Sequence, residues 1–133
     1  MTLVEIRWNK KIAACVPSAL FAFLHISGGM NIIDMLQLLL AGITVGIMFS
    51  SITYASNTVN NSIVVHGVWN FFILGIVGIS VKADHAPLIS YVIHSESIWI
   101  TGGMFGIESG LPAVIGYSLV TLLAIWLCRR RRI

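Results

Sequence analysis

The sequence predicts an all-α protein, a multipass transmembrane helix bundle with four spans in this chain. Its 133 residues are 57% hydrophobic and only 10% charged, whereas soluble domains carry about 25% charged residues. The chain therefore has too few charges to cover a water-facing surface. Its apolar residues form continuous runs, which argues against the alternating pattern of a membrane β-barrel. The length suits one membrane domain, residues 1–133, and no separate soluble domain.

Local signals mark where the spans begin and bend. Pro17 lies inside the first apolar run and predicts a kink there. Asn31, with Asp34 three residues later, is typical of a helix N-terminal cap and opens the second span. Pro112 suits the first turn of the last span. The expected spans are about residues 12–26, 32–54, 62–79 and 111–128.

The distribution of charge predicts the topology. Residues 80–110 are the most polar stretch and are expected to form an aqueous or interfacial loop. Basic residues gather before the first span and after the last, namely Arg7, Lys10, Lys11 and Arg129 to Arg132. The positive-inside rule then places both termini in the cytoplasm and the loop outside, in a multipass protein of the cell membrane. Beside a span, such basic runs indicate contact with membrane lipids and not with nucleic acid.

The second span carries a stripe of small residues, Gly42, Gly46 and Ser50. Small residues four apart let another helix approach closely. One interpretation is helix–helix self-association between two copies of the chain. The other, which a compact bundle favours, is packing of this stripe against the first or third span.

Three polar side chains lie within the apolar runs, where lipid disfavours them. His25 is in the first span, and His66 and Asn70 are in the third. Polar groups at membrane depth usually face a bundle interior or a wet cavity. Residues four apart share a helix face, so His66 and Asn70 point the same way, as do Phe21 and His25. We expect His25, His66 and Asn70 to converge on one polar pocket, although interhelical hydrogen bonds would also explain them.

Such a set supports several chemistries. Two imidazoles and a carboxamide can bind a metal, polarise a carbonyl or position a water molecule. A divalent metal such as zinc therefore remains open as a cofactor. His85, His94 and Glu96 lie in the polar loop without a recognised ligand spacing, which favours a solvated loop. The two cysteines, Cys15 and Cys128, suggest no disulfide framework.

The spacing of these residues resembles a known family. Phe21-x-x-x-His25 followed by His66-x-x-x-Asn70 is similar to the second and third motifs of the CPBP intramembrane proteases. These include the CAAX prenyl endoproteases and bacterial relatives linked to bacteriocin processing or self-immunity. The context Ser18-Ala-Leu-Phe21-Ala-Phe-Leu-His25 also resembles the family, as does the stretch from Trp99 to Gly110 before the last span.

The resemblance implies an intramembrane endopeptidase of membrane-anchored or prenylated peptides, with His25, His66 and Asn70 as catalytic residues. His25 would activate water together with a family glutamate, and His66 and Asn70 would stabilise the oxyanion. The family's first motif, a Glu-Glu pair followed by Arg, does not occur in this sequence, where Glu5 stands alone. The chain thus resembles the C-terminal part of a family member, and we expect it to be weakly active or inactive by itself. The alternatives are a non-catalytic immunity or assembly factor and, less favoured, a small transporter.

Overall fold

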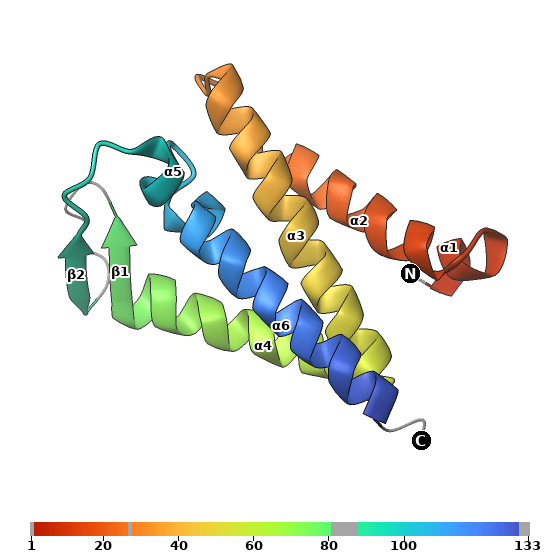
Figure 1. The fold of residues 1–133 in the computed structure, drawn as a ribbon. Coiled ribbons are helices and arrows are strands. Elements are labelled where there is room, and N and C mark those ends of the chain that lie inside the picture. The colour runs from red at the N-terminus through yellow and green to blue at the C-terminus, as the bar shows by residue number, and fades with distance from the viewer. Residues whose placement is uncertain (1, 27, 81–87, 131–133) are drawn as a thin grey trace.

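The computed structural model describes residues 2–26, 28–80 and 88–130, which are mainly helical (Figure 1). Two short strands, β1 (Val77–Ser80) and β2 (Ile89–Val92), pair in parallel. The single-turn elements are a π-helix, η1 (Phe71–Ile76), and a 3-10 helix, η2 (Ile107–Ser109). The α-helices are α1 (Thr2–Arg7), α2 (Lys10–Leu24), α3 (Ile32–Ser56), α4 (Asn60–Asn70), α5 (Ile98–Thr101) and α6 (Leu111–Arg130).

The predicted segments correspond to helices, but two of them are short. Among the described residues, α3 and α6 are long and apolar enough to cross a membrane. Helix α2 has 15 residues and is about 22 Å long at a rise of 1.5 Å per residue, against about 30 Å of hydrocarbon. Helix α4 has 11 residues before it passes into η1. The membrane bundle is therefore supported by two spans, and the count of four stays a prediction.

The predicted end of the third segment at residue 79 was wrong. The helix ends at Ile76, and Val77 to Ile79 belong to β1, which pairs with β2 from inside the predicted loop. The π-helix before this point marks where the α-helical hydrogen-bond ladder changes. The β-branched Val77 and Ile79 then suit an extended strand. A pairing partner more than ten residues away is invisible to local periodicity.

Helix α3 is the centre of the arrangement and packs against both α2 and α6. Figure 1 shows α2 running antiparallel to α3, α6 running in the same direction as α3, and α4 returning the opposite way. The two termini lie at one end of the molecule, and the strands and α5 lie at the other. Asn31 caps α3 as expected, because its Oδ1 accepts from the backbone N–H of Ile33 and of Asp34, both at 2.9 Å.

The small-residue stripe of α3 packs inside the chain. A Cβ added at Gly42 would lie 2.5 Å from the Ala22 Cβ, and one at Gly46 would overlap Ser18 of the same helix α2. Ala22 is fully buried, so the two helices meet at backbone distance. This is the internal packing that the sequence favoured. Self-association through Gly42, Gly46 and Ser50 stays a prediction.

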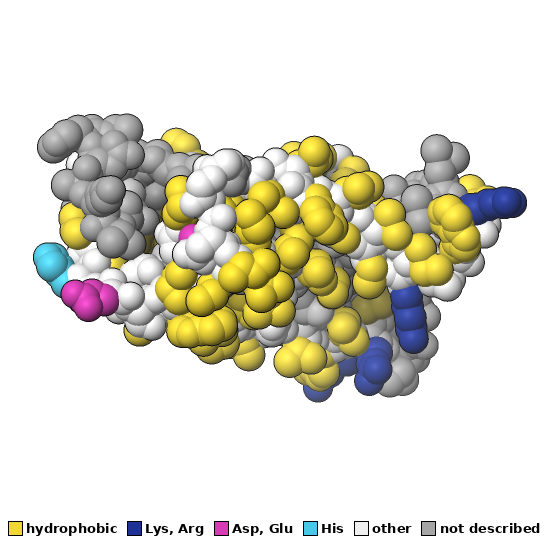
Figure 2. Space-filling view, turned by 90° about the horizontal axis from the view of Figure 1, so that it is seen from above, with side chains coloured by type: hydrophobic (Ala, Val, Ile, Leu, Met, Phe, Trp, Pro, Cys, Tyr) yellow, Lys and Arg dark blue, Asp and Glu magenta, His cyan; other side chains and the backbone are white. Residues whose placement is uncertain are grey.

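The surface is largely apolar. Figure 2 shows hydrophobic side chains over the middle of the molecule and Lys and Arg side chains at one end. At that end the Arg130 guanidinium lies over the Trp126 ring, 4.1 Å from its centroid. Exposed apolar residues come from several helices, including Leu20, Phe23, Ile63, Val64, Val68, Ile115, Leu119 and Leu122. In water this much exposed apolar surface would be unfavourable, and lipid is its natural solvent.

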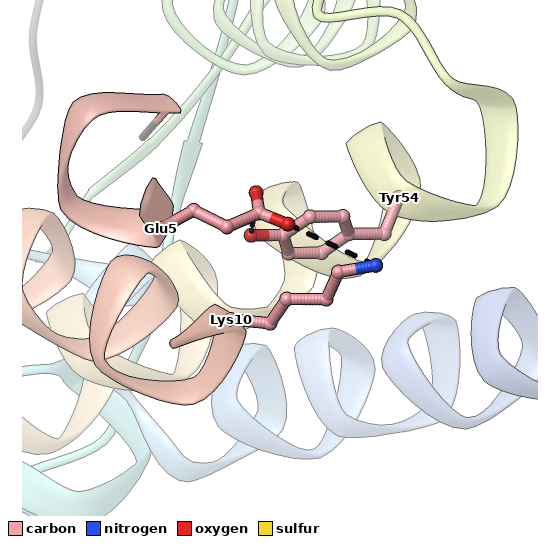
Figure 3. Close-up of polar contacts among 3 residues, drawn as sticks. All are labelled: Glu5, Lys10 and Tyr54. Atoms are coloured by element: carbon pink, nitrogen blue, oxygen red, sulfur yellow. Dashed lines mark hydrogen bonds and ion pairs between the residues drawn. The ribbon is translucent and has the colours of Figure 1, made fainter. Parts of the chain in front are cut away.

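A small polar cluster joins three helices at the basic end (Figure 3). The Tyr54 hydroxyl of α3 donates to Glu5 Oε2 of α1 at 3.0 Å. Lys10 Nζ of α2 lies 3.8 Å from Glu5 Oε1 and 5.4 Å from the centre of the Tyr54 ring. Glu5 therefore has a structural role far from the predicted catalytic residues.

Candidate active site

A cavity of about 630 Å³ is lined by α2, α3, α4, η1, β1, α6 and the segment that precedes α6. His25, His66 and Asn70 all line it, so the structure brings the three predicted residues to one place. The cavity is less polar than we expected, because apolar side chains form most of its wall. These are Phe21, Leu38, Val45, Met48, Phe49, Val65, Ile73, Ile79, Phe105, Ile107 and Val120.

His25 is positioned by the end of its own helix. The last carbonyls of a helix lack intrahelical partners, and His25 Nδ1 lies 2.7 Å from the Phe21 carbonyl oxygen. Since a carbonyl only accepts, Nδ1 carries the proton, and in the neutral ring Nε2 keeps its lone pair. The ring also packs on Phe21, with centroids 4.2 Å apart, and meets Phe105 edge-on at 5.8 Å. His25 thus presents an acceptor nitrogen beside the cavity.

His66 and Asn70 form a pair on one face of α4. Asn70 Nδ2 lies 3.2 Å from His66 Nε2, and the His66 ring meets Phe49 edge-on at 5.3 Å. When the amide donates to Nε2, the ring proton is on Nδ1 and the amide keeps a second N–H. The pair can therefore offer two donors to a developing oxyanion.

Ser62, in the first turn of helix α4, holds this helix against α3 through its hydroxyl group. The hydroxyl of Ser62, which is buried, lies 2.8 Å from the Phe49 carbonyl oxygen and 2.8 Å from Thr53 Oγ1. Ser62, His66 and Asn70 follow one another at four-residue intervals, so anchoring the first directs the other two. The hydrogen bonds of His25, His66 and Asn70 in the described structure stay within their own helices. These bonds do not tie the bundle together.

Glu108 is a cavity residue that sequence reasoning missed. It lies on η2, in the stretch predicted as an aqueous or interfacial loop, and it lines the same cavity. Its Oε1 accepts from Trp69 Nε1 at 2.8 Å, and its backbone oxygen accepts from the Tyr117 hydroxyl at 3.2 Å. The signal that could have found it is the stretch from Trp99 to Gly110, which contains Glu108 and resembles a family loop before the last span.

The segment before α6 has a defined conformation. The fully buried Ser109 hydroxyl lies 2.7 Å from the Gly102 carbonyl oxygen and 3.1 Å from that of Gly106. Both glycines have positive φ, +79° and +99°, a region that side chains disfavour. Gln37 Nε2 of α3 donates to the Ile98 carbonyl oxygen at 2.9 Å and anchors the start of the segment. These hydrogen bonds therefore fix the backbone position of Glu108.

The described residues do not fit a metal centre. They contain no group of three or more His, Cys, Asp or Glu side chains able to hold an ion. His25 Nδ1 is engaged by a carbonyl and His66 Nε2 by an amide, whereas zinc sites use at least three protein ligands. His94 and Glu96 are exposed, and His85 lies outside the described residues.

One comparison with known proteins identifies the family. The family model described as type II CAAX prenyl endopeptidase Rce1-like matches residues 1–72, more than half of the chain. The chain belongs to the Rce1-like family. The match contains both the Phe21–His25 and the His66–Asn70 motifs. Neither the curated proteins nor the solved structures gave a significant match.

Membership explains the apolar surface. An Rce1-like protein with two apolar helices long enough to cross a bilayer is a membrane protein. The match ends at residue 72, within η1, so the segment that carries Glu108 lies beyond the matched residues. Of the cavity residues described above, His25, His66 and Asn70 are therefore within the Rce1-like match, and Glu108 is outside it.

Proposed function

We propose that this Rce1-like chain is an intramembrane endopeptidase that cleaves membrane-anchored or prenylated peptides near their ends. The observation that supports the proposal most directly is the shared cavity of His25, His66 and Asn70. Peptide hydrolysis needs a group that orients water and donors for the oxyanion. The apolar wall of the cavity suits the lipid or apolar part of such a substrate.

The geometry supports a division of roles. His25 offers a free Nε2 to a water molecule, because its Nδ1 is bound to the Phe21 carbonyl. His66 and Asn70 line the same cavity and offer N–H groups there. Water attacks the scissile carbonyl carbon, and the electron pair of the C=O bond moves to the oxygen facing those donors. No step requires a metal ion held by the described residues.

We further propose four crossings with both termini in the cytoplasm. The alternating directions of α2, α3, α4 and α6 and the basic residues at one end support this topology. A single cysteine at Ser95 should react with an impermeant maleimide added outside the cell, in a background without the native cysteines. One placed after Ile133 should react only after lysis. The reverse pattern would contradict the orientation.

The second candidate is a non-catalytic membrane protein, such as an immunity or assembly factor, that retains the site as helix packing. The ring contacts of His25 with Phe21 and of His66 with Phe49 favour this candidate. The two candidates predict different behaviour of the reconstituted chain. A protease should lose cleavage when a cavity residue is changed, whereas a non-catalytic protein has none to lose.

The test is cleavage of a farnesylated reporter peptide by the chain in liposomes. His66→Ala should lower kcat/KM by at least about 100-fold, since one oxyanion donor contributes on that order. His94→Ala, an exposed histidine outside the cavity, is the matched control and should stay within about twofold of wild type. Cleavage by wild type no faster than by His66→Ala would refute the proposed activity and leave the non-catalytic candidate.

A further inference from the structure

We infer that Glu108 is the general base of this cavity, the carboxylate that takes the proton from the attacking water. The inference rests on the proposed function, because it assigns a role within the same hydrolysis. It rests on a residue outside the stretch that matches the Rce1-like family. The evidence is the placement of Glu108 relative to the three predicted residues.

Glu108 lies against the face of α4 that carries the oxyanion donors. Its Oε1 accepts from Trp69 Nε1 at 2.8 Å. Trp69 is three residues after His66 and directly before Asn70, and residues three and four apart share a helix face. The same hydrogen bond holds the carboxylate in one orientation, with Oε1 on the indole. The described residues make no polar contact with the other oxygen, and the side chain lines the cavity.

The same segment also reaches His25. Phe105, three residues before Glu108, meets the His25 ring edge-on at 5.8 Å. One short segment therefore contacts both halves of the site, the end of α2 through Phe105 and α4 through Glu108. The hydroxyl of Ser109 holds the segment closed. The His25 imidazole and the Glu108 carboxylate thus line the same cavity.

The other acidic residues in the described structure are placed elsewhere. Glu5 is bound to Tyr54 and Lys10 at the basic end (Figure 3). Asp34 is buried but does not line the cavity, and Glu96 is exposed. Among the described residues, Glu108 is therefore the carboxylate that can serve His25, His66 and Asn70.

The step balances without any further reactant. The Glu108 carboxylate accepts a proton from water as the water oxygen forms a bond to the scissile carbonyl carbon. The tetrahedral oxyanion then collapses and restores the C=O bond, and the C–N bond breaks. Glu108 returns its proton to the leaving nitrogen, which yields a carboxylic acid and an amine. His25 orients the water through Nε2, and His66 and Asn70 face the oxyanion.

The experiment compares four chains in the liposome assay with the farnesylated reporter. Glu108→Gln keeps an oxygen that can accept from Trp69 but removes the basic group, so kcat should fall at least about 100-fold. Trp69→Phe removes the hydrogen bond and keeps the carboxylate, so kcat should fall less than about tenfold. Glu108→Ala should be slow as well, and added formate should restore at least a tenfold gain, because a small carboxylate can enter the space left behind. Formate should leave Glu108→Gln unchanged.

The outcomes separate this inference from the proposed function. If wild type cleaves, His66→Ala does not and Glu108→Gln stays within twofold of wild type, the base is another group and the protease stands. If Glu108→Gln and Trp69→Phe lose activity equally and formate rescues nothing, Glu108 is only structural and the inference fails. If wild type cleaves no faster than His66→Ala, both the inference and the proposed function fail. Loss with Glu108→Gln, retention with Trp69→Phe and rescue of Glu108→Ala support the base.

Discussion

The close contact between α2 and α3 makes Gly42 a sensitive position, and Gly42→Ala tests it. The new Cβ would lie 2.5 Å from the Ala22 Cβ and 3.0 Å from the Ala22 Cα. Carbon atoms in contact normally lie about 3.5–4.0 Å apart, so the helices must separate by roughly 1 Å or more. Ala22 is fully buried and cannot turn away.

Two contributions of opposite sign, helix propensity and overpacking, decide how Gly42→Ala changes the free energy of unfolding. Replacing Gly by Ala inside a helix stabilises it by about 1 kcal/mol. Overpacking a close contact costs about 1–3 kcal/mol. The net change at Gly42 is therefore between zero and about 2 kcal/mol of destabilisation. Gly67→Ala on α4 has the same propensity gain and meets nothing within 4 Å, so it should stabilise by about 1 kcal/mol.

The assay is reversible unfolding in mixed micelles, followed by circular dichroism. The difference between Gly42→Ala and Gly67→Ala cancels the propensity term and should be about 1–3 kcal/mol in favour of Gly67→Ala. The cleavage assay gives a second measure, since a displaced α2 carries His25 with it, one turn after Ala22. Equal stability of the two variants would refute the packing of α2 on α3 at this glycine.

Three further outcomes follow from the described contacts. Asn31→Ala removes the acceptor of two backbone N–H groups and should lower the free energy of unfolding by about 1 kcal/mol in the same micelle assay; an unchanged value would contradict the cap. Ser109→Ala removes a buried hydrogen bond at 2.7 Å and should cost about 1–2 kcal/mol while slowing reporter cleavage, whereas Ser118→Ala on the exposed side of α6 should do neither. Chelation with EDTA or phenanthroline should change the cleavage rate less than twofold, because the described residues offer no three-ligand site; a larger loss that zinc restores would show that a metal takes part.

Much of the helical fold is predictable from the sequence because its signals are local. Apolar runs of helical length place α2, α3 and α6 within two residues of their observed bounds. The cap at Asn31 depends on side chains only two and three residues away. The shared cavity of His25, His66 and Asn70 follows from the cost of polar groups in lipid combined with the four-residue spacing. These properties do not require knowledge of distant contacts.

The parts that sequence reasoning missed depend on distant contacts. The third segment stops being helical at Val77 because β1 pairs with β2. The two strands are separated in the sequence, so no local hydrophobic pattern predicts that they pair. Glu108 reaches the cavity because Ser109 closes the segment on Gly102, and because Trp69, 39 residues earlier, offers its N–H. The sequence around Glu108 does not indicate that its carboxylate accepts a hydrogen bond from Trp69. Its position is a property of the folded chain.

The stacking of Arg130 on Trp126 has a consequence for depth. Tryptophan and arginine at a helix end prefer the headgroup region. We therefore expect this pair to anchor the end of α6 at the membrane interface and to set the depth of the helix in the bilayer. Tyr117, which lines the cavity wall, precedes Trp126 by nine residues, or about 14 Å along the helix. That is roughly half of a hydrocarbon core of about 30 Å. We therefore expect the cavity to lie near the bilayer midplane, where a lipid-attached peptide would arrive by lateral diffusion and water would be the scarce reactant.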